Sequence, residues 1–254
     1  MNTLERIVAT TRAEVERRRG PLTLPPSPAH GALKFAEALR RPGLSLIAEH
    51  KRRSPSAGVI RAEMSLEDVV GAYVRGGAAA LSVLTEEANF GGSPDDLRRA
   101  RAVTELPVLR KDFIVDPYQV DESVAIGADA ILLIVAALGD EDLRELHAQA
   151  LGRGLSVLVE VHDPRELERA LACEASIVGV NNRDLRTLEV DTAQTFQLLP
   201  EVPDGVITVA ESGFNAPEQL VALRDAGVDA VLIGEALMRA QDIEQATRTL
   251  LGAL

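Results

Sequence analysis

The sequence is poor in several residue types, and each shortage excludes a class of protein. The single cysteine, Cys173, cannot form an intramolecular disulfide, which argues against a disulfide-stapled secreted scaffold and fits a reducing compartment. No apolar run approaches the ~20 residues that a membrane-spanning helix needs. Residues 1–8 are charged and amphipathic, unlike a signal peptide. We therefore expect a soluble, cytoplasmic protein in which Cys173 is a small buried residue.

Positive charge and aromatic residues are also scarce. The formal net charge is −12, so no broad basic surface is available for nucleic acid or an anionic membrane. A small anionic substrate remains possible where a local site collects positive groups. Aromatic residues make up 3% of the chain, so the core must be built from Val, Leu, Ile and Ala. Such aliphatic segments suit a sheet that is buried on both faces.

Lysine is the scarcest charged residue type, with three lysines among 27 basic residues. Arginine is effectively always protonated, whereas the pKa of a lysine can fall on desolvation, so only lysine suits proton transfer. Lys51 and Lys111 each follow directly after an expected strand, and Lys34 lies near the N-terminus. The simple alternative is that the three lysines remain at random positions in an arginine-rich chain. The residues around Lys51 and Lys111 distinguish this alternative from a functional role.

Short apolar runs alternate with helical patterns from residue 44 onward. An N-terminal stretch, residues 1–43, precedes them and carries an amphipathic helical pattern at 3–19 and a second at 32–40. The expected strands are 44–49, 79–84, 107–110, 130–134, 156–160, 177–180, 206–210 and 230–233. The expected helices between them include 66–75, 118–126, 141–151, 164–171, 193–198 and 217–226.

Eight strands with intervening helices leave two architectures, an open doubly wound sheet and a closed (β/α)₈ barrel. The strand count favours the barrel. A Gly-Ala/Val-Asp-Ala motif at 127–130 and again at 227–230 suggests repeating units, and no linker interrupts residues 44–242. We therefore predict an α/β fold with one domain, residues 1–254, a (β/α)₈ TIM barrel in which residues 1–43 form an N-terminal helical extension.

Polar residues follow nearly every expected strand, which is where a barrel gathers its catalytic groups. Loops are polar in general, but charges attached so closely to strands are costly to bury without a function. A network of two lysines and several carboxylates is expected to lower the lysine pKa values by desolvation and to keep selected carboxylates ionised. It suits dehydration or carbonyl chemistry. The candidates are Glu49, Lys51, Lys111, Glu160, Asn181 and Glu211.

Small residues after the last two strands predict an anion site. Ser212 and Gly213 follow one strand and Gly234 the other, so backbone N–H groups can approach a phosphate there. Ser54 in the long first loop could add donors. No P-loop exists, so a nucleoside triphosphate is not expected.

The four histidines share no metal-ligand spacing, so neither a metal nor another cofactor is expected. His147 lies in a helical pattern and is expected to be exposed. His50 and His162, beside strand ends, are interpreted as bystanders rather than ligands.

Several segments together resemble one family. They are 47–56 (IAEHKRRSPS), 81–86 (LSVLTE), 90–93 (FGGS), 106–113 (LPVLRKDF), 158–162 (LVEVH), 179–185 (GVNNRDL) and 210–213 (AESG). In this order they resemble the indole-3-glycerol phosphate synthases, and the resemblance extends from the N-terminal helix to Met238. It implies a lyase of tryptophan biosynthesis that converts 1-(2-carboxyphenylamino)-1-deoxyribulose 5-phosphate into indole-3-glycerol phosphate, with loss of CO₂ and water. No cofactor or partner chain is implied, and a monomer is expected.

The resemblance also implies roles for individual residues. Lys111 would be the general acid on the substrate carbonyl oxygen, Glu160 would transfer a proton during dehydration, and Lys51 would hold the anthranilate carboxylate and could act as an acid later. The supporting polar residues would be Glu49, Asn181, Glu211 and Ser212. The phosphate would contact Ser54, Gly213, Gly234 and the backbone around Glu235, with Arg183 nearby. The aromatic ring would lie among Phe90, Phe113, Leu132 and Leu185.

The chain departs from the family pattern at three positions. Arg53 stands where a lysine sometimes touches phosphate, and its guanidinium could still bind it. His50 stands where an apolar or aromatic residue is common. Glu235 replaces a hydroxyl residue, so the phosphate contact there would depend on backbone N–H groups.

Two alternatives remain from the sequence alone. The chain could be another phosphate-binding barrel, such as a phosphoribosyl isomerase or a tryptophan synthase α subunit, although an isomerase would not need the pair Lys51 and Lys111. It could also be a non-catalytic barrel that senses a phosphorylated metabolite, which the set Lys51, Lys111 and Glu160 argues against.

Overall fold

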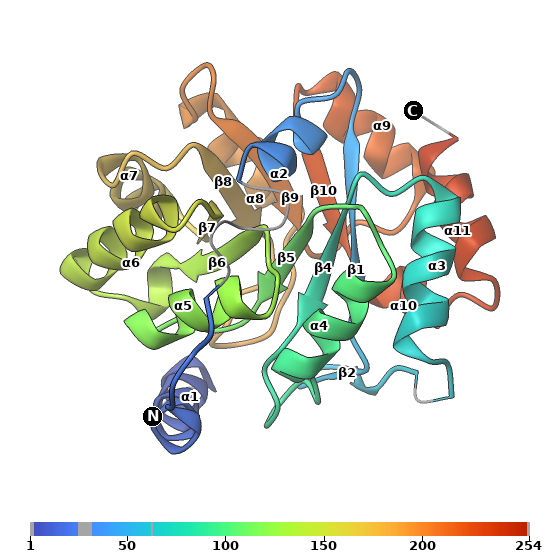
Figure 1. Cartoon of the computed structure of the whole chain (residues 1–254). Helices are drawn as coiled ribbons and strands as arrows, with labels where there is room; N and C mark the ends of the chain where they lie inside the picture. The colour runs from blue at the N-terminus through green and yellow to red at the C-terminus, as the bar shows by residue number, and fades with distance from the viewer. Residues whose placement is uncertain (1–2, 25–31, 62, 253–254) are drawn as a thin grey trace.

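Eight parallel strands close into one barrel in the computed structural model, which describes residues 3–24, 32–61 and 63–252 (Figure 1). Each strand pairs with its neighbours along the chain, and the last pairs with the first. The strands are β1 (Ser45–His50), β4 (Ala80–Leu84), β5 (Val108–Lys111), β6 (Ala130–Ile134), β7 (Ser156–Val161), β8 (Ile177–Asn181), β9 (Ile207–Glu211) and β10 (Ala230–Ile233). All eight expected strands are confirmed, each within one residue at either end.

Helices separate the strands and form the outer layer of the barrel (Figure 1). They are α3 (Leu66–Gly76), α4 (Pro94–Ala102), α5 (Pro117–Ala125), α6 (Asp140–Gly152), α7 (Pro164–Ala172), α8 (Ala193–Leu198), α9 (Pro217–Asp225), α10 (Glu235–Arg239) and α11 (Ile243–Leu251). Short 3₁₀ turns occupy Val135–Ala137 and Leu199–Glu201, and a small hairpin of β2 (Arg53–Ser54) and β3 (Gly58–Val59) occupies the first loop. The helix α4, the last two helices and the hairpin were not anticipated from the sequence.

Three of the helices begin with the same two features, a proline in the first turn and a capping side chain before it. Proline occupies the first turn of α4, α5 and α7, where its missing N–H has no intrahelical partner. The residues before these prolines, Ser93, Asp116 and Asp163, accept hydrogen bonds from helix amides through their side chains.

The repeated Gly-Ala/Val-Asp-Ala motif joins a helix to the strand that follows it, α5 to β6 and α9 to β10. The glycine of each copy has a positive φ, which ends the helix at little steric cost. The aspartate then reaches back to the preceding strand. Asp129 accepts a hydrogen bond from the amide of Val108 at 2.8 Å, and Asp229 accepts one from the amide of Thr208 at 2.7 Å. The motif therefore sets the register between neighbouring strands.

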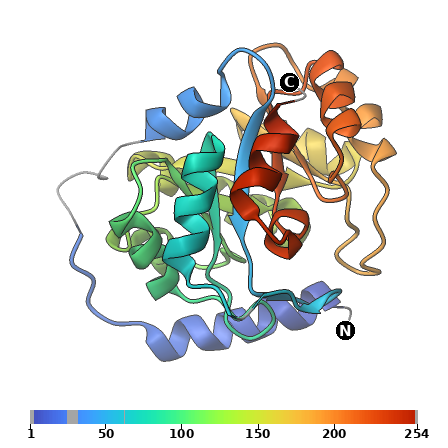
Figure 2. The ribbon, with the colours of Figure 1, turned by 90° about the vertical axis from the view of Figure 1, so that its right-hand side faces the viewer.

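The two N-terminal helices, α1 (Thr3–Arg18) and α2 (Ala32–Leu39), lie at opposite ends of the barrel (Figure 2). From α2, Phe35 and Leu39 join the apolar cluster inside the barrel and are fully buried. From α1, Leu4 and Ile7 join the same cluster beside residues near the carboxyl ends of the strands. Helix α1 therefore covers the end of the barrel at which the candidate site residues were expected.

Two expectations about single residues have opposite outcomes. Cys173 is buried, as predicted. His147 is only 4% exposed, so the expectation of an exposed histidine is wrong, because this face of α6 packs against the barrel. None of the described helices is long and apolar enough to cross a membrane.

Candidate functional site

A cavity of about 420 Å³ opens at the carboxyl ends of the barrel strands, a size usual for small-molecule sites. All the residues predicted for the site line this one cavity. They are Glu49, Lys51, Ser54, Phe90, Lys111, Phe113, Leu132, Glu160, Asn181, Arg183, Leu185, Glu211, Ser212, Gly213, Gly234 and Glu235. Their placement is a structural fact, and their roles remain predictions.

The alternation of side chains along each strand explains this convergence. In β7, Leu158 belongs to the cluster inside the barrel, whereas Val159 and Val161 pack against the helices. Glu160 has the same parity as Leu158 and therefore faces inward. In β1 the inward residue Ile47 puts Glu49 on the same face. The candidate side chains extend the inward rows of the strands beyond the apolar core.

Lys111 lies at the centre of the charged groups. Its Nζ is 3.0 Å from Oε2 of Glu160 and also contacts Oε2 of Glu211. Burial disfavours its charge, but the charges of Glu160, Glu211 and Glu49 outweigh burial, and the pKa of Lys111 rises above its usual value. The expectation that the network lowers this pKa is wrong, because two carboxylates contact the ammonium and the charge of a third, Glu49, adds to their effect. Lys111 therefore holds its proton at neutral pH.

The pKa values of the two carboxyl groups beside Lys111 are shifted in opposite directions. Burial opposes the charge of Glu160, but Lys111, His162 and a hydrogen bond from Asn181 prevail and lower its pKa. For Glu211, burial together with the charges of Glu160 and Glu49 exceeds the opposing effect of Lys111 and raises its pKa to about 7. Opposite pKa shifts in neighbouring carboxyls are typical of an acid and base pair in an active site.

Lys51 forms a second ion pair in the cavity. Its Nζ is 2.8 Å from Oε1 of Glu49, and the hydroxyl of Ser82 donates to the other oxygen of that carboxylate at 3.3 Å. Lys51 is part-exposed toward the cavity, with a side chain that is 17% exposed. An ammonium at the wall of a cavity can leave its carboxylate partner for an anionic group of a ligand.

Two glycines make room for the carboxylates. A Cβ atom on Gly179 would lie 2.2 Å from Oε1 of Glu211, and one on Gly234 would lie 2.6 Å from Oε1 of Glu49. Both distances are far below van der Waals contact. The glycines in β8 and after β10 are therefore required by the positions of these two side chains.

The expected anion site has an unusual backbone. Ser212 and Gly213 both have positive φ, at 62° and 89°, and such strain in a non-glycine residue is often found at functional sites. A Cβ atom on Gly213 would lie 2.5 Å from Cγ2 of Thr192, so the loop after β8 packs directly on this turn. The carboxylate of Glu235 pairs with Arg239 at 3.0 Å.

The apolar part of the cavity combines expected and unexpected residues. The rings of Phe90 and Phe113 lie 6.4 Å apart between centroids, at an interplanar angle of 36°. Sequence reasoning missed the contributions of Thr3, Leu4 and Ile7 from α1, and of Arg239 from α10. The amphipathic pattern of the first helix was visible in the sequence, but nothing local showed that its apolar face lies over the cavity.

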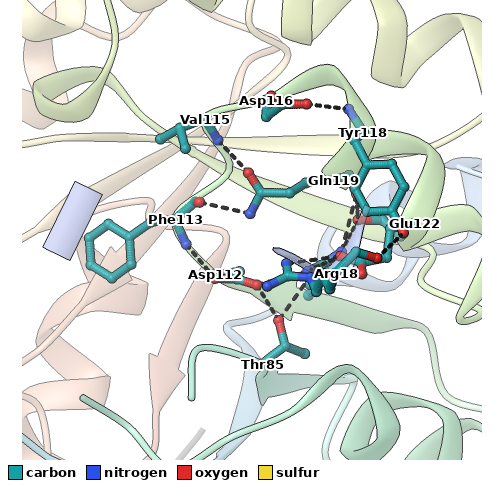
Figure 3. A network of polar contacts seen from close by, with 11 residues as sticks. Arg18, Thr85, Asp112, Phe113, Val115, Asp116, Tyr118, Gln119 and Glu122 are labelled. Carbon is teal, nitrogen blue, oxygen red and sulfur yellow. Dashed lines mark hydrogen bonds and ion pairs between the residues drawn. The ribbon is translucent and has the colours of Figure 1, made fainter. Parts of the chain in front are cut away.

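A network of polar contacts, buried except at Arg18, holds α1 on the barrel (Figure 3). Arg18 donates two hydrogen bonds to the carboxylate of Glu122 in α5, at 2.9 and 3.0 Å. Glu122 also accepts a bond from Arg110 at 2.7 Å, and Arg110 continues to Asp112 at 2.9 Å. Arg110 is fully buried on the outward face of β5, next to Lys111. The network thus connects the N-terminal helix to the strand that carries the central lysine.

The cavity lining does not include His50, Arg52 or Arg53. Arg52 forms a bidentate ion pair with Asp96, at 2.7 and 2.6 Å. Arg53 donates to the backbone oxygens of Glu87 and Ala88 and does not line the cavity, so the expectation that it could bind phosphate lacks support. The side chain of His50 is buried on the outer face of β1, where burial lowers its pKa to about 4.

Within the described ranges, no group of three or more His, Cys, Asp or Glu side chains could hold a metal ion. The cavity instead combines two ammonium groups paired with the carboxylates of Glu49, Glu160 and Glu211, a strained turn and an apolar slot. Together with the closed barrel, these features define an acid–base enzyme of the (β/α)₈ class with a site for a small anionic, partly apolar substrate.

Comparison with known proteins identifies the family within this class of enzymes. Residues 4–250 match the family model of indole-3-glycerol phosphate synthase. The chain is 49% identical over 251 residues to "Indole-3-glycerol phosphate synthase 2" of Streptomyces coelicolor, with 97% of each chain covered. It is 48% identical over 257 residues to the indole-3-glycerol phosphate synthase of Azospirillum brasilense, with 98% of each covered. The chain belongs to the indole-3-glycerol phosphate synthase family, which are carboxy-lyases of tryptophan biosynthesis.

More distant solved structures share the fold. A 3-hexulose-6-phosphate synthase superposes with a TM-score of 0.68 at 15% identity, covering 83% of this chain and 100% of that one. A thiamine phosphate pyrophosphorylase from Pyrococcus furiosus superposes with a TM-score of 0.62 at 19% identity, covering 85% and 96%. At such low identity the likeness concerns the barrel alone.

Proposed function

We propose that this cavity catalyses ring closure, decarboxylation and dehydration of 1-(2-carboxyphenylamino)-1-deoxyribulose 5-phosphate. The observation that carries the proposal is the position of Lys111, protonated between Glu160 and Glu211, in a cavity that also holds the Lys51–Glu49 pair. Such a site supplies two separate proton donors and a base, which the three stages require.

Ring closure uses Lys111 as the general acid. The aryl carbon that bears the carboxylate attacks the ketone carbon of the sugar chain, and the carbonyl oxygen takes a proton from Nζ of Lys111. The raised pKa keeps the proton available before the reaction. Loss of CO₂ then returns the electron pair of the broken carbon–carbon bond to the ring and restores its aromaticity.

Dehydration uses the other groups. The hydroxyl formed by ring closure leaves as water with a proton from Lys51, and Glu160 removes a proton from the adjacent ring carbon, so that the double bond of the indole forms. The lowered pKa of Glu160 means that this carboxylate is ionised and able to accept the proton. Glu49 orients Lys51, and Asn181 orients Glu160. The charge of Glu211 helps to raise the pKa of Lys111.

Substrate binding follows the polarity of the walls. The phosphate would lie by the turn at Ser212 and Gly213, the backbone of Gly234 and the hydroxyl of Ser54, with Arg183 nearby. The aromatic ring would lie against Phe90, Phe113, Leu132 and Leu185. All the residues to which the proposal gives a role in the reaction line this cavity, so the proposal calls on no residue of a second copy, and we propose that the protein acts as a monomer.

The test is the fluorescence of newly formed indole-3-glycerol phosphate. We expect turnover by the wild type, loss of kcat by about 10³-fold or more in Lys111→Ala, and unchanged turnover in Lys34→Ala, which removes an exposed lysine in α2 at the far end of the barrel. Normal turnover by Lys111→Ala would contradict the assignment of the general acid. A wild type that binds the substrate without turning it over would favour the metabolite sensor instead.

A further inference from the structure

His162 lies beside the proposed base but has no part in the chemistry described so far. It follows the last residue of β7 and has the same parity as Glu160, two residues earlier. Its ring is placed between two carboxylates. Nε2 is 3.5 Å from Oε1 of Glu160, and Nδ1 is 2.9 Å from Oε2 of Glu166 in the first turn of α7. The ring therefore bridges the end of the strand and the start of the next helix.

Glu166 fixes the orientation of this ring. The same oxygen, Oε2, accepts a second bond from the backbone amide of His162 at 2.8 Å. The amide of Glu166 in turn donates to Asp163, the N-cap of α7, at 2.8 Å. With Nδ1 donating to Glu166, Nε2 is the ring atom that faces Glu160. A carboxylate that orients a histidine in this way also determines which nitrogen is available.

The two atoms that face one another are incompletely bonded. Oε1 of Glu160 and Nε2 of His162 are both buried, and neither has a hydrogen bond of good geometry within the part of the chain that the structure describes. The other oxygen of Glu160 contacts Lys111 at 3.0 Å. Buried polar atoms without partners are rare, and here two of them are separated by slightly more than one hydrogen-bond length.

The charges around the ring favour a cation. Burial opposes protonation, but the hydrogen bond to Glu166 and the charges of Glu160, Glu166 and Glu211 outweigh it and raise the pKa of His162. Lys111 is the other cation of the group and contacts Glu160 and Glu211. An imidazolium at this position faces Oε1 of Glu160, whereas Lys111 contacts Oε2.

We propose that His162, oriented by Glu166, is a positioning residue that holds Oε1 of Glu160, keeps this carboxylate ionised, and leaves Oε2 for Lys111 and the substrate. The proposal deepens the proposed function and rests on it, since it concerns the base of the dehydration. The interpretation of His162 as a bystander is replaced by a role one step removed from the substrate.

The first experiment measures the pairing without turnover. The chain has four histidines, so their ring signals can be titrated by NMR, and His162→Asn identifies the signal of His162. Glu160→Gln should lower the pKa of His162 because it removes a facing negative charge. Glu168→Gln, at an exposed position of α7, should leave the pKa of His162 unchanged. Equal titration curves in these two variants would overturn the proposed pairing, whatever the activity of the protein.

The second experiment separates positioning from structure. His162→Asn should lower kcat about tenfold with KM within about twofold, and should move the acidic limb of the kcat profile to higher pH, because Glu160 loses a stabilising cation. His162→Gln, whose amide can reach the position of Nε2, should recover most of kcat without moving the limb back. A His162→Asn variant that is less stable but keeps the wild-type kcat and pH profile would show a merely structural histidine. Absence of turnover in the wild type would count against the proposed function alone, since the titration still decides the pairing.

Discussion

The ion pairs of Glu122 predict that two substitutions, Glu122→Gln and Arg18→Gln, lower the free energy of unfolding by clearly different amounts. Glu122 accepts hydrogen bonds from Arg18 in the N-terminal helix and from Arg110 in β5. Arg110 is fully buried, whereas the side chain of Arg18 is 29% exposed. Glu122→Gln therefore leaves a buried guanidinium with one charged partner fewer, while Arg18→Gln leaves the buried pair of Glu122 and Arg110 intact.

The magnitudes follow from burial. Removing one partner of a buried ion pair costs about 3–5 kcal/mol, and since Arg110 keeps Asp112 at 2.9 Å, we expect about 3 kcal/mol for Glu122→Gln. A part-exposed pair contributes about 1 kcal/mol, so Arg18→Gln should cost roughly that amount. The measurement is the free energy of unfolding from urea titrations of both variants. A smaller loss for Glu122→Gln than for Arg18→Gln would refute the reasoning, because it would mean that Arg110 does not depend on Glu122.

The same variants test the role of α1 in binding. The helix places Leu4 and Ile7 at the cavity, whereas the proposed acid–base groups belong to the barrel strands and the residue that follows β1. Arg18→Gln should therefore raise KM by up to about fivefold, given ~1 kcal/mol of lost docking energy, with kcat nearly unchanged. Arg12→Gln, exposed on the same helix, is the matched control. A fall in kcat at unchanged KM would argue that α1 acts on the reacting groups instead.

Two further predictions concern single positions. Gly179→Ala should lower kcat at least about tenfold and stability by about 1–3 kcal/mol, because its Cβ would lie 2.2 Å from Oε1 of Glu211. The control, Gly152→Ala, has open space around its Cβ and should keep both kcat and stability. Steady-state kinetics and urea unfolding measure the two effects. For His50 the folded pKa of about 4 lies below the usual 6.5, so its contribution to stability is present above pH 6.5 and is lost as the pH falls toward 4. His50→Leu should lose about 2 kcal/mol less stability than the wild type between pH 7 and pH 5, and an identical loss would show that His50 is not held neutral by the fold.

The sequence predicted the strands and the placement of the site residues well, for a local reason. Strands buried on both faces read as continuous apolar runs between helix signals, and in a barrel their carboxyl ends meet by geometry. Lys111 and Glu160 come from strands far apart in the sequence, yet the closure of the sheet places them 3.0 Å apart. No long-range information beyond the strand count was needed for that.

Other features depended on information that no local pattern carries. The sign of the pKa shift of Lys111 depends on how many carboxylates reach it, and burial alone predicted the wrong direction. The position of α1 over the cavity depends on contacts such as Arg18 with Glu122, which are 104 residues apart. The short helix α10 has a single turn and its start at Gly234 lacks a side-chain cap, so its sequence gave little sign of it.

The alternation in β5 assigns stability and chemistry to adjacent residues. Lys111 faces the cavity, and Arg110 faces the helices, where Glu122, Ser123, Gln119 and Asp112 accept its hydrogen bonds. Arg110 therefore fixes the backbone on one side of Lys111 without contributing to the lining of the cavity. Because the two side chains point to opposite faces of the sheet, a change at the outward position should act mainly on folding and on the docking of α1. A change at the inward position should act on the reaction. An enzyme with a buried lysine between carboxylates can tolerate the repulsion among those carboxylates when hydrogen bonds on the outer face of the sheet fix the strand that carries the lysine. In this protein the hydrogen bonds of Arg110 do so for β5.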